Sequence, residues 1–149
     1  MQGGAIQRQD EEEVEAKHLQ RQDEEEVEAK HLQREVKAKH LEYFCDVENR
    51  ESKEIVSGVR IRTFWGDNML SSIVDLDANA VVPAHTHPHE QTGAVISGEF
   101  EMTIDGETRW IGPGDTYIIP GGVEHGGRTG DAPARILDVF SPVRESYQY

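Results

Sequence analysis

The second half of the chain contains four side chains of the kinds that bind metal ions. His85 and His87 are two residues apart, Gln91 follows His87 by four, and His125 follows a turn that begins at Pro120. Because side chains alternate faces along a strand, His85 and His87 should point the same way and hold one ion. The pattern predicts a site for one divalent metal ion, and these donors leave nickel, zinc, manganese and iron open.

A second group of residues that could take part in catalysis lies near the C-terminal end of the sequence. Ile136, Asp138 and Phe140 alternate along an expected strand, which places a carboxylate between two apolar neighbours on one face. Burial would raise the pKa of that carboxyl group and prepare it for proton transfer. Arg144 follows the strand, and its guanidinium could hold a substrate carboxylate through two parallel hydrogen bonds. On the residues alone, the simpler hypothesis is that Asp138 and Arg144 pair with each other or with the backbone.

For three further side chains, His89, Trp65 and Trp110, the sequence gives weaker support for a functional role. His89 has the same parity as His87, but Pro88 interrupts the strand pattern, so we expect His89 at the rim of the site rather than on the ion. Trp65 and Trp110 could line a sugar pocket. Each stands in an apolar, strand-like run, which favours ordinary packing.

The elements that must position these residues are β-strands. From residue 43 to residue 149 the sequence consists of short apolar or alternating runs separated by Gly, Pro, Asn and Asp, which is typical of an all-β domain. The turn Asp105-Gly106 predicts a tight hairpin, because both central residues tolerate a positive φ. The length suffices for one jelly-roll barrel. The expected strands are Val59–Phe64, Met69–Leu76, Thr92–Ser97, Glu99–Ile104, Thr108–Ile111, Thr116–Ile119 and Arg135–Phe140.

Residues 1–42 form a separate, charged extension that we expect to be helical or disordered. Residues 8–20 are repeated letter for letter at 21–33, and a shortened copy follows at 34–42. A 13-residue period advances about 220° beyond whole helical turns, so no continuous apolar seam results and a long coiled coil is disfavoured. The extension is either a short oligomerisation or docking helix or a solvated expansion of a small unit, and the missing seam favours the second. The repeat histidines have no metal-ligand spacing; they are His18, His31 and His40.

Composition excludes several classes of partner. The formal net charge of -14 argues against nucleic acid and anionic membrane, because both require clustered Lys and Arg. Cys45 is the single cysteine, so no internal disulfide forms and a reducing compartment is expected. The sequence has no signal-peptide core and no apolar run of membrane-spanning length, so we expect a cytoplasmic protein.

The two metal-binding stretches together resemble the two motifs of the cupin superfamily. The matching positions are His85, His87, Gln91 and Gly98 in the first motif and Gly114, Pro120, Gly122 and His125 in the second. The resemblance covers residues 43–149. It implies a small β-barrel, a double-stranded β-helix, in which His85, His87, Gln91 and His125 converge on one divalent ion near the open end. It also implies a homodimer, since small cupins commonly pair by burying a strand face. The remaining alternative is a barrel whose polar mouth binds only water.

Gln91 departs from the pattern of the many cupins that have glutamate at this position. Three neutral imidazoles and an amide leave the full double charge on the ion, which raises its Lewis acidity. The same neutrality stabilises an oxidised ferric state less well and so disfavours oxygen-activating chemistry. Glutamine is also a weak ligand, so the affinity for metal is expected to be modest.

The C-terminal run and the two motifs also look like the KdgF-type cupins, which convert 4,5-unsaturated uronates into linear ketouronates. The resemblance implies a small sugar acid as substrate, a ring-opening reaction without an organic cofactor, and active-site roles for Asp138, Phe140 and Arg144. Two alternatives stay open: a metal-dependent dioxygenase, and a non-catalytic sugar-binding or sensor cupin.

Overall fold

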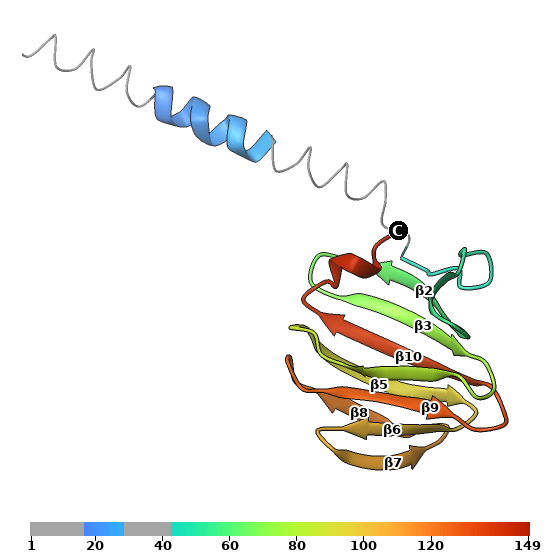
Figure 1. Ribbon diagram of the computed structural model, residues 1–149. Helices are drawn as coiled ribbons and strands as arrows, with labels where there is room; N and C mark the ends of the chain where they lie inside the picture. Colours follow the sequence, from blue (N-terminus) through green and yellow to red (C-terminus); the bar gives the residue numbers. More distant parts are fainter. Residues whose placement is uncertain (1–16, 29–42) are drawn as a thin grey trace, which may run out of the picture. The chain divides into compact units, whose positions relative to one another are not determined.

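The computed structural model describes residues 17–28 and 43–149 (Figure 1). The chain divides into two units, Met1–Phe44 and Cys45–Tyr149, and each is described by itself. In the first unit residues 17–28 form a helix with every side chain exposed, including His18. The predictions for residues 1–16 and 29–42, among them His31 and His40, lie outside the described residues. No helix in the described ranges is long and apolar enough to cross a membrane.

The second unit contains two antiparallel sheets, as expected for an all-β jelly roll (Figure 1). The six-stranded sheet has the order β1 (Lys53–Val56), β2 (Val59–Trp65), β3 (Leu70–Leu76), β10 (Ala134–Ser141), β5 (Glu90–Ser97) and β8 (Thr116–Ile119). The four-stranded sheet has the order β4 (Val81–His85), β9 (His125–Thr129), β6 (Phe100–Ile104) and β7 (Glu107–Ile111). A short 3-10 helix, η1 (Glu145–Tyr147), follows β10.

All seven strands expected from the sequence are present, with ends that differ by no more than two residues. The hairpin at Asp105-Gly106 is also confirmed, because both residues have positive φ values of 48° and 79°. The sequence did not reveal β1, β4 and β9. β4 contains Pro83, and β9 contains Gly126 and Gly127, and these residue types weaken an intrinsic strand signal. Pairing with neighbouring strands forms these elements despite the weak local preference.

The core lies between the two sheets and follows from alternation along the strands. β2 and β3 bury every second residue, and the fully buried side chains include Val59, Ile61 and Leu76. β6 adds Phe100 and Met102 from the opposite sheet. Burying an aliphatic or aromatic side chain of this size contributes roughly 1.5–3 kcal/mol to stability, so this layer is the main source of the barrel's stability.

Strand register arranges the inner face of the six-stranded sheet in rows that run across the strands. The first row is aliphatic and consists of Ile61, Val74, Ile136 and Val95. The next is polar apart from one glycine and consists of Thr63, Ser72, Asp138, Gly93 and Tyr117. The third contains Leu70, Phe140, Gln91 and Ile119. A polar row therefore lies between two mostly apolar rows, and Asp138, Tyr117 and Gln91 from the second and third rows line the pocket that holds the candidate site.

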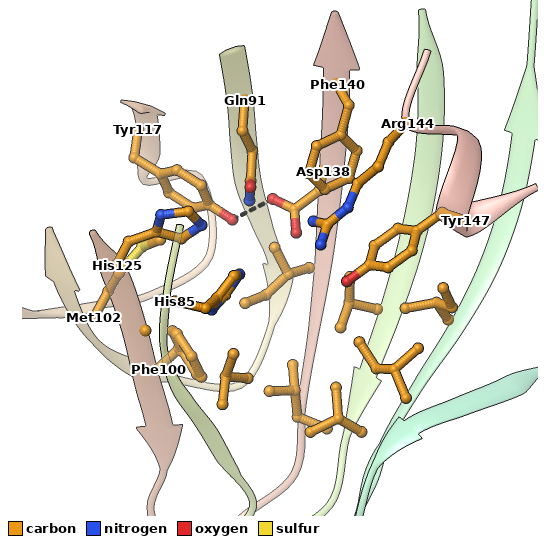
Figure 2. A pocket seen from close by; sticks show the side chains of 18 residues that line it. His85, Gln91, Phe100, Met102, Tyr117, His125, Asp138, Phe140, Arg144 and Tyr147 are labelled. Carbon is orange, nitrogen blue, oxygen red and sulfur yellow. Dashed lines mark hydrogen bonds between the residues drawn. The ribbon is translucent and has the colours of Figure 1, made fainter. Parts of the chain in front are cut away.

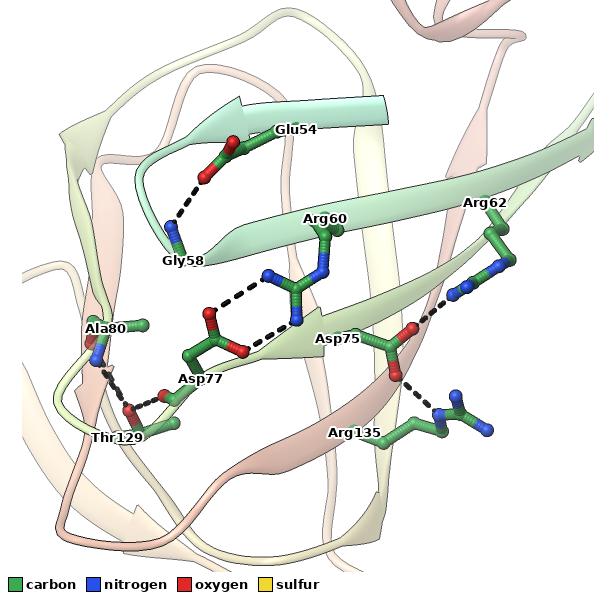
Figure 3. Close-up of polar contacts among 9 residues, drawn as sticks. All are labelled: Glu54, Gly58, Arg60, Arg62, Asp75, Asp77, Ala80, Thr129 and Arg135. Carbon is green, nitrogen blue, oxygen red and sulfur yellow. Dashed lines mark hydrogen bonds and ion pairs between the residues drawn. The ribbon is translucent and has the colours of Figure 1, made fainter. Parts of the chain in front are cut away.

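A separate cluster of charges lies on β2, β3 and β10 toward the other end of β3 (Figure 3). Asp75 accepts hydrogen bonds from Arg62 on one carboxylate oxygen and from Arg135 on the other, the latter at 2.6 Å. Asp77 receives two hydrogen bonds from Arg60, at 2.6 and 2.9 Å. We call these five residues the Arg–Asp network.

Candidate metal centre

Three histidines from two neighbouring segments meet in the second unit. β4 ends at His85 and β9 begins at His125, and the two are cross-strand partners. His87 lies just beyond β4, in the loop that leads to β5. One ring nitrogen from each histidine lies within 4.8 Å of those of the other two. The ring centroids of His85 and His125 are 4.4 Å apart, and those of His87 and His125 are 4.9 Å apart. This spacing allows the three rings to hold one metal ion.

The sequence argument for His85 and His87 was wrong about its cause. It required both residues to lie on one strand, whereas the strand stops at His85. His87 reaches the cluster through the loop, where its Nδ1 contacts the backbone oxygen of His89 at 3.0 Å. His89 is not a member of this group of three.

Backbone carbonyls fix the protonation pattern of all three rings. The Nδ1 atoms of His85, His87 and His125 lie 2.8, 3.0 and 2.9 Å from the carbonyl oxygens of Pro83, His89 and Val123, respectively. A carbonyl oxygen only accepts, so Nδ1 carries the proton in each case. The neutral imidazole then has its lone pair on Nε2, the atom available to a metal. The Nε2 of His125 is buried and has no hydrogen-bond partner.

Gln91 belongs to the same cluster. Its Oε1 lies 3.0 Å from Nε2 of His87. With the proton of His87 on Nδ1, these two facing atoms are both acceptors and repel each other. A cation that both atoms coordinate would remove that repulsion. His87, Gln91 and His125 are only 8%, 5% and 4% exposed, so water does not easily replace such a cation.

The charge state of the rings also suits metal binding. Burial lowers the pKa of His87 to about 4, with a further contribution from the positive charge of Arg144. Burial likewise lowers the pKa of His125 below its ordinary value. Both rings are therefore neutral at pH 7, which is the form that ligates a metal.

A pocket adjoins the histidines and contains the C-terminal candidates (Figure 2). Asp138, Phe140 and Arg144 line it together with His85, His125 and Gln91. Its inner part is apolar and is formed by side chains such as Val74, Leu76, Phe100, Met102 and Ile136. The polar groups therefore gather at one end of the pocket, against a hydrophobic floor.

Comparison with known proteins agrees with this geometry. The family model described as "Cupin domain" matches residues 72–140. The pectin degradation protein KdgF of Dickeya dadantii (strain 3937) is 30% identical over 107 residues, which cover 70% of this chain and 96% of that protein. The chain is a cupin. Among solved structures, KdgF from Halomonas sp. matches this cupin with a TM-score of 0.67 and 27% identity, covering 70% of this chain and 97% of the other. An RmlC-like cupin from Shewanella frigidimarina NCIMB 400 matches with a TM-score of 0.68 and 28% identity, covering 72% and 97%.

Asp138 does not pair with Arg144 in this cupin, contrary to the simpler hypothesis from the residues alone. Its Oδ1 accepts a hydrogen bond of 2.5 Å from the hydroxyl of Tyr117 (Figure 2), and no ion pair joins it to Arg144 in the described part of the chain. Burial raises the pKa of Asp138 to about 6, against the opposing effects of hydrogen bonds from Tyr117 and Gln91 and of the charge on Arg144. The carboxyl group can therefore exist in either protonation state near neutral pH.

The guanidinium of Arg144 contacts two aromatic rings of the cupin. Its guanidinium centre lies 3.9 Å from the ring centroid of Tyr147 and 5.1 Å from that of Phe140. Thr63 fixes the adjoining turn, since its Oγ1 donates to the backbone oxygen of Tyr147 at 2.6 Å. The two aromatic contacts leave N–H groups of the guanidinium available for an anionic ligand.

Sequence reasoning missed Tyr117 and Tyr147, which both line the pocket. Tyr117 stands in a short apolar strand and was counted as part of that strand only. Trp65 and Trp110 are absent from the pocket lining. They are 38% and 49% exposed, and Arg50 and Arg128 lie over their rings, so neither is an ordinary core residue.

Proposed function

We propose that this cupin is a metal-dependent enzyme that opens the ring of 4,5-unsaturated uronates and yields linear ketouronates. The observation that carries the proposal is the pocket itself, where the imidazoles of His85 and His125, a buried carboxyl group and a guanidinium line one cavity, with His87 grouped beside the two imidazoles. The likeness to KdgF of Dickeya dadantii, which is named a pectin degradation protein, supports a sugar acid as the substrate class.

His85, His87 and His125 would hold one divalent ion through Nε2, and Gln91 would add its amide oxygen. The carbonyl contacts of the three Nδ1 atoms and the unpartnered Nε2 of His125 support this ligand set. Nickel, zinc, manganese and iron all fit such donors. A bound ion supplies Lewis acidity, which stabilises negative charge on a substrate oxygen as the ring opens.

Arg144 binds the substrate carboxylate, and Phe140 forms an apolar wall beside the sugar ring. A guanidinium matches a carboxylate through two parallel hydrogen bonds. The contacts of Arg144 with the rings of Phe140 and Tyr147 support this role, because they restrict the orientation of the group before the substrate arrives. The apolar floor supports exclusion of water from the reacting part of the ligand.

Asp138 accepts and donates the proton that moves during the reaction. Ring opening removes a proton from the anomeric hydroxyl, breaks the bond between the anomeric carbon and the ring oxygen, and leaves an enol. Tautomerisation then places a proton on the double-bond carbon remote from the carboxylate, so the reaction has no net oxidation and needs no organic cofactor. The position of Asp138 in the pocket wall and its raised pKa of about 6 support this task.

The test supplies a 4,5-unsaturated uronate to metal-loaded protein and follows loss of the absorbance of the conjugated double bond. Asp138→Asn should retain metal and lose turnover by roughly 100-fold or more, because proton transfer by a positioned group contributes that much. Oxygen uptake is recorded in the same samples. Wild-type protein that binds the uronate without consuming it, or that consumes oxygen instead, would refute the proposal.

We also propose that the protein forms a homodimer, because small cupins commonly pair through a strand face. Light scattering of the purified protein measures the mass directly. A mass of one chain at working concentration would rule the dimer out.

A further inference from the structure

We infer that Tyr117 positions the Asp138 carboxylate for proton transfer, and that Gly93 supplies the space in which the two side chains meet. The inference rests on the proposed function, because it assigns Asp138 the proton-transfer step. It adds Gly93 on β5 and Tyr117 on β8 to a site otherwise built from β4, β9, β10, Gln91 of β5 and the loops beside them.

Register places the three residues side by side. Asp138 on β10 is the direct partner of Gly93 on β5, and Gly93 is the direct partner of Tyr117 on β8. Tyr117 and Asp138 are therefore two strands apart, a separation at which side chains normally have another residue between them. Here they form a hydrogen bond of 2.5 Å across the middle strand (Figure 2).

Gly93 is the reason that this contact exists. A Cβ at position 93 would lie 2.4 Å from the hydroxyl oxygen of Tyr117 and 2.5 Å from Oδ1 of Asp138. The backbone of Gly93 does not have a positive φ, so the position needs glycine for space and not for conformation. Glycine inside a strand costs roughly 0.5–1 kcal/mol relative to alanine, and the contact above it explains why the strand carries one here.

The direction of the hydrogen bond follows from the two groups, because the phenol donates and a carboxylate oxygen only accepts. The phenol engages Oδ1 of Asp138 and leaves the second oxygen for the pocket. Figure 2 shows the carboxylate between the Tyr117 hydroxyl and the Arg144 guanidinium, which is where a bound sugar acid would be.

The strand on the other side of Asp138 provides no comparable support. Ser72 on β3 is its register partner there, and the Ser72 hydroxyl is buried with no hydrogen-bond partner. Tyr117 is thus the hydroxyl that holds the carboxylate, and the amide of Gln91 assists it. Without the phenol, the carboxylate could turn about its side-chain bonds, and a misplaced proton carrier reacts more slowly.

The kinetic test compares Tyr117→Phe, Gly93→Ala and the control Gly66→Ala, using metal-loaded protein and an unsaturated uronate. Tyr117→Phe keeps the ring and removes the hydroxyl, so the fold should survive. Gly66 has no atom within 4 Å of an added Cβ and does not have a positive φ. We expect Tyr117→Phe and Gly93→Ala each to lower kcat by about 10- to 100-fold with KM and metal content unchanged, and Gly66→Ala to match the wild type. A purely structural role would instead lower Tm and raise KM.

A second readout is independent of activity. Proton NMR of the wild type should show a slowly exchanging tyrosine hydroxyl that correlates with the Tyr117 ring, and this signal should be lost in Tyr117→Phe and altered in Gly93→Ala. No such signal in the wild type would overturn the inference. A wild-type kcat in Tyr117→Phe would overturn it while leaving the proposed function intact, whereas an inactive wild type with the NMR signal present would overturn the proposed function and with it the role in proton transfer.

Discussion

The polar end of the pocket and the Arg–Asp network share strand β10 but differ in how their polar atoms are satisfied. In the network both oxygens of Asp75 and both oxygens of Asp77 have guanidinium partners (Figure 3). In the pocket the Nε2 of His125 has no partner, and the facing atoms of His87 and Gln91 are both acceptors. The network is complete without a ligand. The pocket contains buried polar atoms that only a ligand can satisfy.

The two regions therefore differ in their contribution to the stability of the fold. A buried polar group without a partner costs about 1–3 kcal/mol, so the pocket is a place where the fold loses stability. The aliphatic row beneath the pocket and the paired charges of the Arg–Asp network offset that loss. Unsatisfied polar groups that converge on one point therefore mark a functional site.

Removal of the metal should have the largest effect. Treatment with a chelator followed by dialysis should lower uronate conversion by roughly 1000-fold or more, because the charge that develops on the substrate oxygen would lose its stabilisation. Adding back a divalent ion should restore conversion. The absorbance assay with parallel metal analysis measures both, and unchanged activity in metal-free protein would contradict the proposed role of the ion.

Metal binding should also raise thermal stability. An ion at 100 times its Kd stabilises the folded state by about 2.7 kcal/mol, so Tm should rise on titration. His125→Ala should abolish the shift, whereas Asp75→Asn in the network should keep it. Calorimetric scans with and without metal test the contrast, and a shift that survives in His125→Ala would place the ion elsewhere.

Asp75→Asn should lower stability without affecting the pocket. It weakens contacts to Arg62 and Arg135 in a part-buried setting, where the Asp75 side chain is 18% exposed. We expect a loss of about 1–2 kcal/mol in the free energy of unfolding. Urea denaturation measures this loss, and kcat at a temperature well below Tm should equal that of the wild type. A lower kcat in folded protein would show that the two regions are coupled.

Arg60→Ala should have the smallest effect. Its pair with Asp77 is exposed, with 36% and 53% of the two side chains open to solvent, and pairs of this kind contribute about 0–1 kcal/mol. Urea denaturation should show a change within that range, and added salt should reduce it further. A loss as large as that of Asp75→Asn would mean that the Arg–Asp network acts as one unit.

The sequence allowed the strands with clear alternation and the cupin motifs to be predicted, because both depend on local spacing. It did not predict β9, since two adjacent glycines hide a strand whose neighbours require them. An added Cβ at Gly126 would lie 2.8 Å from the backbone oxygen of Val82, and one at Gly127 would lie 2.4 Å from that of Glu101. The need for glycine at these two positions comes from contacts with other segments, so the local sequence of β9 does not reveal it.

The same limit explains the residues that were missed at the site. His85 and His125 are 40 positions apart and become neighbours only through the pairing of β4 with β9. The cupin motifs pointed to these two residues, but nothing local linked Tyr117 to Asp138. Their contact depends on register across three strands and on the missing side chain of Gly93. The boundary of the extension after residue 42 and the role of its repeats remain predictions.

The most direct test of the account is the metal content of purified protein, measured for the wild type, His87→Ala and Asp138→Asn. The account predicts one divalent ion per chain in the wild type and in Asp138→Asn, and loss of that ion in His87→Ala. A wild type that binds no divalent ion when it is supplied, or a His87→Ala variant that binds as much as the wild type, would contradict it.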